Sequence, residues 1–122
     1  MSIERQIAGK AKDLVSAQIG QAKESEYRAL CESFPMLLRG AGLAQTLAFV
    51  RVKHGVFYEH LESQFRTLGM LGQETLSEKA ADPRLSLAEY RLYSEVAMHA
   101  ALWHKRMAQA LLKKKPKEKA TP

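Results

Sequence analysis

The sequence predicts an all-α fold, a compact bundle of about five to six helices with a long C-terminal helix and a disordered basic tail. Apolar residues recur at spacings of three and four along most of the chain, which is typical of amphipathic helices. No segment alternates apolar and polar residues as a half-buried strand does. The 122 residues suffice for one hydrophobic core. We therefore expect a single helical domain over residues 1–112 and a lysine-rich tail over residues 113–122.

The first helix is expected between residue 3 and Gly20, because glycine is a common helix end. Its apolar side is formed by six residues, Ile3, Ile7, Ala11, Leu14, Val15 and Ile19. A second helix is expected to begin near Glu24. Its apolar side is formed by Tyr27, Leu30, Cys31 and Phe34. The spacing of three and four residues turns each of these sets towards the core.

The stretch FPMLLRGAGLAQTLAFV, residues 34–50, carries a single charge, Arg39. Pro35 lacks a backbone donor, so we expect the second helix to kink or restart there. Gly40 and Gly42 can adopt backbone angles that other residues avoid, and we expect them to end this helix and redirect the chain. We also expect the two helices to meet here so closely that only residues without a Cβ fit. The helix that follows is apolar on almost every side, which is typical of a helix surrounded by others.

Gly55 separates that helix from the next one, which is amphipathic and closes near Gly69 or Gly72. The apolar side of this helix is formed by Phe57, Leu61, Gln64, Phe65, Leu68 and Leu71. From residue 73 to residue 85 the pattern becomes a polar connector that contains Pro83, with room for one helical turn.

The last helix has a clear start signal in Ser86 and Glu89. A serine followed three residues later by a glutamate forms a capping box, in which each side chain bonds the other residue's backbone N–H. The apolar stripe that follows comprises Tyr90, Tyr93, Ala97, Ala100, His104, Met107 and Leu111. We expect a helix of about 26 residues that ends where the lysine run begins.

The net charge of +6 is unevenly distributed. The tail carries five lysines and one glutamate, hence +4, which leaves +2 for residues 1–112. A basic tail of this kind is usually solvated and adds non-specific attraction to nucleic acid or acidic surfaces. A specific nucleic-acid surface must therefore come from basic residues that cluster on the folded domain.

The lone Cys31 excludes an internal disulfide framework and fits a reducing compartment. The N-terminus alternates charged and apolar residues, unlike a signal peptide. Pro35, two glycines and two arginines make residues 34–52 unsuitable as a membrane-spanning helix. We expect a soluble, cytoplasmic protein.

No constellation of residues predicts catalysis, a cofactor or a metal site. The four histidines, His54, His60, His99 and His104, are six and five residues apart within each pair, so neither pair stacks on one helical face. His104 lies on the apolar stripe, where we expect it to be semi-buried and hydrogen-bonded, whereas His99 lies off it. No glycine-flanked serine is present, and Cys31 has no evident base as a partner. We expect the protein not to be an enzyme.

The glycine-linked helices also resemble a helix-turn-helix in outline. The second helix of that motif must present polar or basic side chains to base edges. Its first turns here offer only Gln45 and Thr46, with apolar residues around them. A core role for this helix is therefore favoured over DNA reading.

The central segment resembles the small helical subunit of the type III-B CRISPR effector complex, the Cmr (RAMP module) complex. The residues that carry the resemblance are Pro35, Leu37, Leu38, Arg39, Gly42, Leu43, Gln45, Thr46, Leu47, Ala48 and Phe49. The series Gly-Leu-x-Gln-Thr-Leu-Ala-Phe is not a generic helix pattern, so the motif is specific. A long last helix, with Tyr90 and Trp103, is similar to that of family members.

The resemblance implies a non-catalytic scaffold for antiviral defence, whose partners are the other Cmr subunits, guide RNA and target RNA, with no membrane or small-molecule substrate. On this resemblance, several copies are expected to stack head to tail as a minor filament beside the backbone subunits and to help line the channel that holds the paired RNAs. Guide–target pairing reads the sequence, so the protein needs only positive charge and shape. Six basic residues are candidates for contacts with the RNA backbone: Arg39, Arg51, Lys53, Arg91, Lys105 and Arg106.

Two alternatives stay open at the level of sequence. One is a small DNA-binding regulator, which would have measurable affinity for duplex DNA as an isolated protein. The other is a helical adaptor whose partner is a protein, with the basic tail serving solubility. The adaptor would bind no nucleic acid even when assembled.

Overall fold

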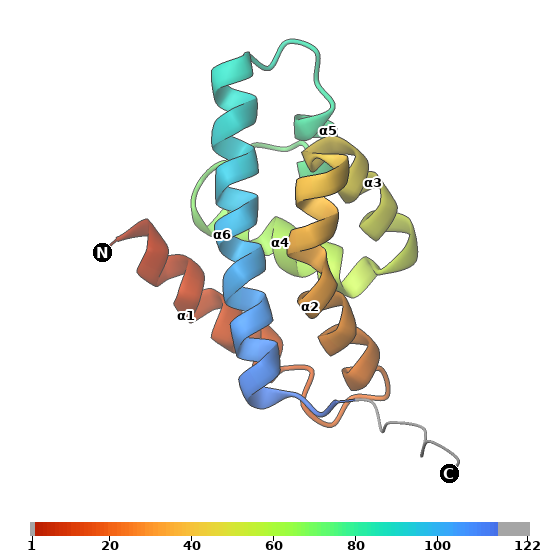
Figure 1. Cartoon of the computed structure of the whole chain (residues 1–122). Helices are drawn as coiled ribbons and strands as arrows, with labels where there is room; N and C mark the ends of the chain where they lie inside the picture. Colours follow the sequence, from red (N-terminus) through yellow and green to blue (C-terminus); the bar gives the residue numbers. More distant parts are fainter. Residues whose placement is uncertain (1, 115–122) are drawn as a thin grey trace.

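The computed structural model describes residues 2–114, and this part of the chain consists of six α-helices without a strand (Figure 1). This confirms the predicted all-α class and the long C-terminal helix. The helices are α1 (Ile3–Ser16), α2 (Glu24–Ala41), α3 (Leu43–Lys53), α4 (Gly55–Thr67), α5 (Leu76–Ala80) and α6 (Leu87–Leu111). The short α5 is the single turn expected in the polar connector.

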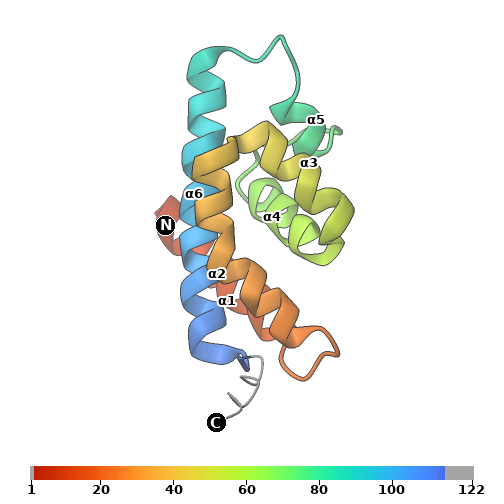
Figure 2. The ribbon, with the colours of Figure 1, turned by 45° about the vertical axis from the view of Figure 1, so that its right-hand side comes forward.

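Helix α6 runs along the molecule and packs against α1 and α2, while α3, α4 and α5 group beside them (Figures 1 and 2). The largest core side chains include Phe34 of α2 and Phe57 and Phe65 of α4, all fully buried. The rings of Phe34 and Phe57 lie 4.7 Å apart between centroids, in a tilted arrangement typical of aromatic pairs. One apolar cluster therefore joins the helices into one core.

The start of α6 is as predicted. The amide of Glu89 donates to the Ser86 hydroxyl at 3.1 Å, and the Ser86 amide donates to the Glu89 carboxylate at 3.3 Å. The same reciprocal pair occurs at the start of α5, between Thr75 and Glu78. Each box satisfies donors that a helix N-terminus leaves free.

Helix α1 ends earlier than predicted, at Ser16 rather than at Gly20. The amides of residues 18 and 19 bond carbonyls three residues back, so the chain tightens into turns after the helix. Gly20 has a φ of +80° and donates its N–H to the Glu24 carboxylate at 2.8 Å. This side-chain contact draws the loop towards α2, and Ile19 stays exposed outside the core.

We expected α2 to kink or restart at Pro35, and of these two outcomes the restart is wrong, because α2 continues through the proline to Ala41. Pro35 removes one intrahelical hydrogen bond, but Phe34 and Leu38 on its two sides are buried in the core. Their packing holds the helix together across the proline. Gly40 also lies within α2 and does not end it.

Gly42 does redirect the chain, as predicted, with φ +82° and ψ 168° between α2 and α3. The expectation that close approach excludes a Cβ is wrong. A Cβ built on Gly42 would meet only the Tyr90 hydroxyl, at an ordinary 3.8 Å, and one built on Gly40 would meet nothing within 4 Å. The backbone angles of residue 42 require glycine. Gly40 has no positive φ and no close neighbour, so neither its conformation nor its surroundings require glycine.

Helix α3 is not surrounded by other helices, which corrects the sequence-based expectation. One face is buried and comprises Leu43, Thr46, Leu47 and Val50. The other face is open, with Phe49 46% exposed and Val52 81% exposed. The described part of the chain therefore leaves one apolar side of α3 uncovered.

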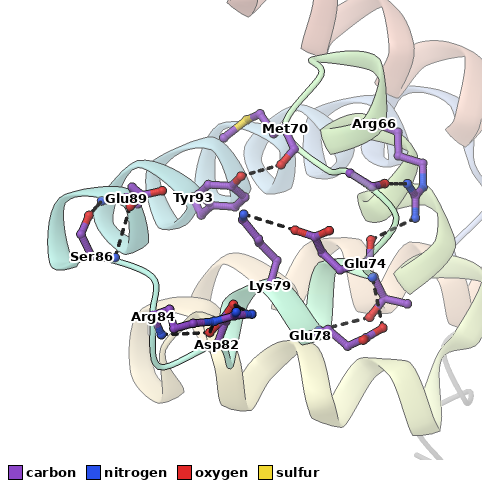
Figure 3. Close-up of polar contacts among 12 residues, drawn as sticks. Arg66, Met70, Glu74, Glu78, Lys79, Asp82, Arg84, Ser86, Glu89 and Tyr93 are labelled. Atoms are coloured by element: carbon purple, nitrogen blue, oxygen red, sulfur yellow. Dashed lines mark hydrogen bonds and ion pairs between the residues drawn. The ribbon is translucent and has the colours of Figure 1, made fainter.

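Polar contacts hold the connector between α4 and α6, as Figure 3 shows. Lys79 pairs with Glu74 at 3.2 Å, and Arg84 pairs with Asp82 at 3.0 Å. Arg66 of α4 donates to the carbonyl of Gly72 at 3.0 Å. Arg66 thus ties the segment to α4, and the buried Leu76 and Ala80 join it to the core.

The C-terminal end of α6 is fastened to the start of α2. Arg28 donates to the carbonyl of Leu112 at 2.9 Å, and the Lys113 amide donates to the Glu24 carboxylate at 2.7 Å. The first residues of the predicted tail thus contact the domain. Residues 115–122, the rest of the tail for which disorder is expected, lie outside the described residues.

Candidate nucleic-acid interface

The structure places all six candidate basic residues at or near the surface. Arg39 is on α2, Arg51 and Lys53 are on α3, and the other three are on α6; five are exposed and Lys105 is partly exposed. Ion pairs within residues 2–114 involve other cations, those of Arg28, Arg66, Lys79 and Arg84. The six candidates thus keep their charge available to a partner.

Two of the six side chains place guanidinium groups over aromatic rings. Arg51 lies 5.6 Å from the ring centroid of Tyr58 in α4, and Arg106 lies 5.1 Å from that of Trp103 in α6. A cation over an aromatic face is held by the ring quadrupole, with about 0.5–1 kcal/mol at exposed sites. The rings restrict where these guanidinium groups point without neutralising them.

The six residues lie in different parts of the fold and do not form one cluster. Arg39 precedes the α2–α3 junction, where the Ala44 amide donates to the Tyr90 hydroxyl at 3.2 Å, so Arg39 and Arg91 lie at the same end of the α2–α6 pair. Lys105 and Arg106 lie towards the other end of α6. With about 100° per residue, the three candidates of α6 fall within about 100° of arc on one helical side. Arg51 and Lys53 lie in the last turn of α3, next to the α3–α4 corner.

The motif residues divide between core and surface. Pro35, Leu43, Thr46 and Leu47 are buried, and the Thr46 hydroxyl donates to the Leu37 carbonyl at 3.2 Å, which ties α3 to α2. Gln45 and Phe49 point outwards on the open face of α3. Of the two polar residues that the first turns of α3 offer to a helix-turn-helix, only Gln45 is therefore exposed.

One basic residue at a cavity was missed by the sequence analysis. A cavity of about 120 Å³ lies where the α1–α2 loop meets the α3–α4 corner, and Lys23 lines it together with Lys53 and His54. Lys23 occupies the N-cap of α2, where its side chain makes no capping bond. Lysine is unusual at that position, which could have served as a signal in the sequence.

The buried polar side chains form a hydrogen-bonded network within the core. The Tyr27 hydroxyl lies 2.7 Å from His60 Nδ1 and 3.4 Å from His104 Nδ1. Gln64 Nε2 lies 3.2 Å from His104 Nε2 and donates to the Ile7 carbonyl at 3.0 Å. His104 is therefore hydrogen-bonded, as predicted, but fully rather than partly buried.

This environment makes the buried groups poor catalysts. Burial, with a smaller effect from nearby His60, lowers the pKa of His104 to about 3. Burial raises the pKa of the Cys31 thiol to about 12, although its hydrogen bond with Tyr27 opposes the rise. At neutral pH the imidazole is uncharged and the thiol is protonated, so Cys31 is not an activated nucleophile.

No group of three or more His, Cys, Asp or Glu side chains within residues 2–114 is placed to hold a metal ion. In the same range, every helix is too short or too polar to cross a bilayer.

Comparison with known proteins identifies relatives over nearly the whole chain. The family model described as CRISPR-associated protein (Cas_Cmr5) matches residues 3–111, from the first residue of α1 to the last of α6. The CRISPR system Cmr subunit Cmr5 of Thermus thermophilus is 37% identical over 106 residues, which cover 86% of this chain and 91% of that protein. The crystal structure of a CRISPR-associated Cmr5 family protein from Thermus thermophilus matches with a TM-score of 0.76 and 31% identity. That match covers 93% of this chain and 100% of the other.

Proposed function

Because the chain belongs to the CRISPR-associated Cmr5 family, whose members are subunits of the type III-B Cmr complex, we propose that it lines the RNA channel of that complex without catalysing a reaction. The family assignment confirms the resemblance found in the sequence and implies association with the other Cmr subunits. The proposal adds that copies of the chain stack as a minor filament. In that position they help to hold the paired guide and target RNAs.

The observation that carries the RNA-facing role is the set of six surface cations without ion-pair partners among residues 2–114. Guide–target pairing reads the sequence, so a lining subunit needs only charge and shape to hold the RNA backbone. The guanidinium groups of Arg51 and Arg106 are additionally oriented by aromatic rings. Oriented, unneutralised cations are suited to phosphate contacts.

Head-to-tail stacking requires two different, complementary patches on each copy. Exposed apolar side chains are available on separate elements. Phe49 and Val52 lie on the open face of α3, whereas Leu92 and Leu102 lie on α6. Their separation supports a contact between unlike surfaces.

The non-catalytic role is supported by what the chemically versatile side chains do in the fold. His104 bonds Gln64 in the core, and Cys31 is protonated and buried. Neither is accessible to an RNA phosphate. The family's small subunit is thus proposed to act by position and charge.

The proposed function is tested with complexes reconstituted from Cmr subunits and two triple variants of this chain. One variant carries Arg39→Gln, Arg51→Gln and Lys53→Gln, and the other Arg91→Gln, Lys105→Gln and Arg106→Gln. We expect both chains to assemble and at least one complex to bind target RNA roughly tenfold more weakly, with a shallower salt dependence. Each lost phosphate contact reduces the slope of log K against log salt by about 0.7–0.9.

The matched control is a triple variant of α1, Arg5→Gln, Lys10→Gln and Lys12→Gln, which removes the same charge elsewhere. Its complex should bind target RNA within about twofold of the wild type, because non-specific attraction alone changes little at physiological salt. If both test variants bound RNA as tightly as this control, the RNA-lining role would be wrong.

A further inference from the structure

The cavity beside Lys53 combines an apolar floor with polar groups at its rim. The floor is formed by Tyr27, Leu30 and Phe57, all buried, and the rim includes exposed Lys23 and Lys53. Its volume of about 120 Å³ exceeds the space of a single water molecule severalfold. A small polar group attached to a larger molecule can therefore enter it.

The charged side chains at this rim form no ion pair within the described part of the chain. Lys23 and Lys53 lie outside the ion pairs found in residues 2–114, and so does Glu26, which also lines the cavity. The two lysines and the glutamate together give the rim a net charge of one positive unit. An anion is favoured there, and Glu26 weakens the attraction.

The position of Lys23 is not explained by the stability of α2. A cation at a helix N-terminus opposes the helix dipole, and Ser, Thr, Asp or Asn would satisfy a free amide there. Lys23 does neither, since its side chain makes no capping bond. Its placement is instead consistent with a role at the cavity.

The first turn of α4 adds backbone donors to the same cavity. Gly55 and Val56 line it, no side chain caps this helix, and its first turn contains no acidic residue. The amide groups of a helix start point outwards and carry partial positive charge. They supplement the two lysines.

We propose that this cavity binds a phosphate of the RNA backbone, with Lys23 and Lys53 as its cationic rim and the apolar floor facing the ribose. This inference rests on the proposed function and names a specific contact within it. An RNA phosphate is favoured over an acidic peptide because Lys53, which lines the cavity, is one of the six residues already proposed to face RNA. Lys23 thus becomes a seventh RNA-contacting residue.

The test uses reconstituted complexes with two single variants outside the six candidates. Lys23→Glu is expected to weaken target-RNA binding by roughly tenfold at low salt, because it removes one contact and adds repulsion. Glu26→Gln is expected to strengthen binding by about two- to threefold, because it removes the opposing charge. Lys12→Glu, on the outward side of α1 and away from the cavity lining, is the charge-matched control and should leave affinity within about twofold.

Acetylation of Lys23 in the assembled complex gives a second readout. We expect target RNA to protect Lys23 from acetylation and to leave Lys12 reactive. If Lys23→Glu bound RNA like Lys12→Glu while a triple variant of the six candidates lost affinity, the cavity site would be overturned and the proposed function would stand. If Lys23→Glu instead reduced incorporation of the chain into the complex, the cavity would be a protein contact, which also overturns the proposal.

Discussion

Replacement of Gly42 by valine is expected to destabilise the domain by about 2–3 kcal/mol, because the residue has φ +82° and ψ 168°. This backbone region is essentially restricted to glycine, and a β-branched side chain is the least tolerant of it. The loss is a large share of a typical domain stability of about 5–15 kcal/mol. Thermal unfolding followed by circular dichroism should show a melting temperature lower by about 10 °C.

Gly40→Ala is the matched control, two residues earlier. Gly40 lies within α2, has no positive φ, and an added Cβ would meet nothing within 4 Å. Alanine there should be neutral or stabilising by about 0.5–1 kcal/mol, because it favours helix. If Gly42→Val melted at the wild-type temperature, the conformation assigned to the α2–α3 junction would be wrong.

The domain is expected to lose stability as the pH falls below 6.5, because His104 is buried in its neutral form. Gln64 Nε2 donates to the Ile7 carbonyl and lies 3.2 Å from His104 Nε2, which must accept from the amide and therefore be unprotonated. His104 Nδ1 faces the Tyr27 hydroxyl at 3.4 Å. No carboxylate among the described residues takes part in this network to stabilise an imidazolium.

The direction of this pH dependence follows from the pKa values of His104 in the folded and unfolded states. The pKa of His104 is about 3 in the folded protein and 6.5 for an unperturbed histidine, so between these values the unfolded state binds a proton that the folded state does not. Stability is complete above pH 6.5 and falls towards pH 3, by up to about 1.4 kcal/mol per pH unit. Burial and the charge of Lys10 also lower the pKa of His60, which adds in the same direction.

Urea unfolding between about pH 7.5 and pH 5 measures this effect before most carboxylates titrate. His104→Gln should reduce the slope of the unfolding free energy against pH by up to about 1.4 kcal/mol per pH unit, which corresponds to one proton. This holds whatever the effect of the substitution on stability at about pH 7.5. If that variant does not fold, NMR titration of the wild type gives the same information. Ring signals of His104 that shifted with a pKa near 6.5 would contradict the assignment.

Local signals in the sequence predicted much of the fold. The capping box at Ser86 located the start of α6, and residues spaced by three and four predicted buried sides such as Tyr27 and Phe34. The restart at Pro35 was wrong because packing on both sides of a proline outweighs one lost hydrogen bond. The burial of α3 was wrong because an apolar helix face does not indicate whether it is covered by its own chain or by a partner.

The polar features were less predictable because they depend on residues far apart in the sequence. The partners of His104 are 40 and 77 residues away, at Gln64 and Tyr27, and no local pattern relates them. The cavity that includes Lys23 forms only when the α1–α2 loop meets the α3–α4 corner. The six basic candidates could be named from sequence, but their distribution over the two ends of the α2–α6 pair and the α3–α4 corner required the fold.

Affinity purification of the tagged chain from its native cells after ultraviolet crosslinking, with proteins identified and crosslinked RNA sequenced, tests both its membership of a Cmr complex and its contact with RNA. We expect recovery of the other Cmr subunits, with short guide RNAs that share a repeat-derived 5′ end and crosslinks to this chain. Recovery of neither Cmr subunits nor guide RNA, together with binding of duplex DNA by the isolated chain, would contradict this expectation and favour a DNA-binding regulator.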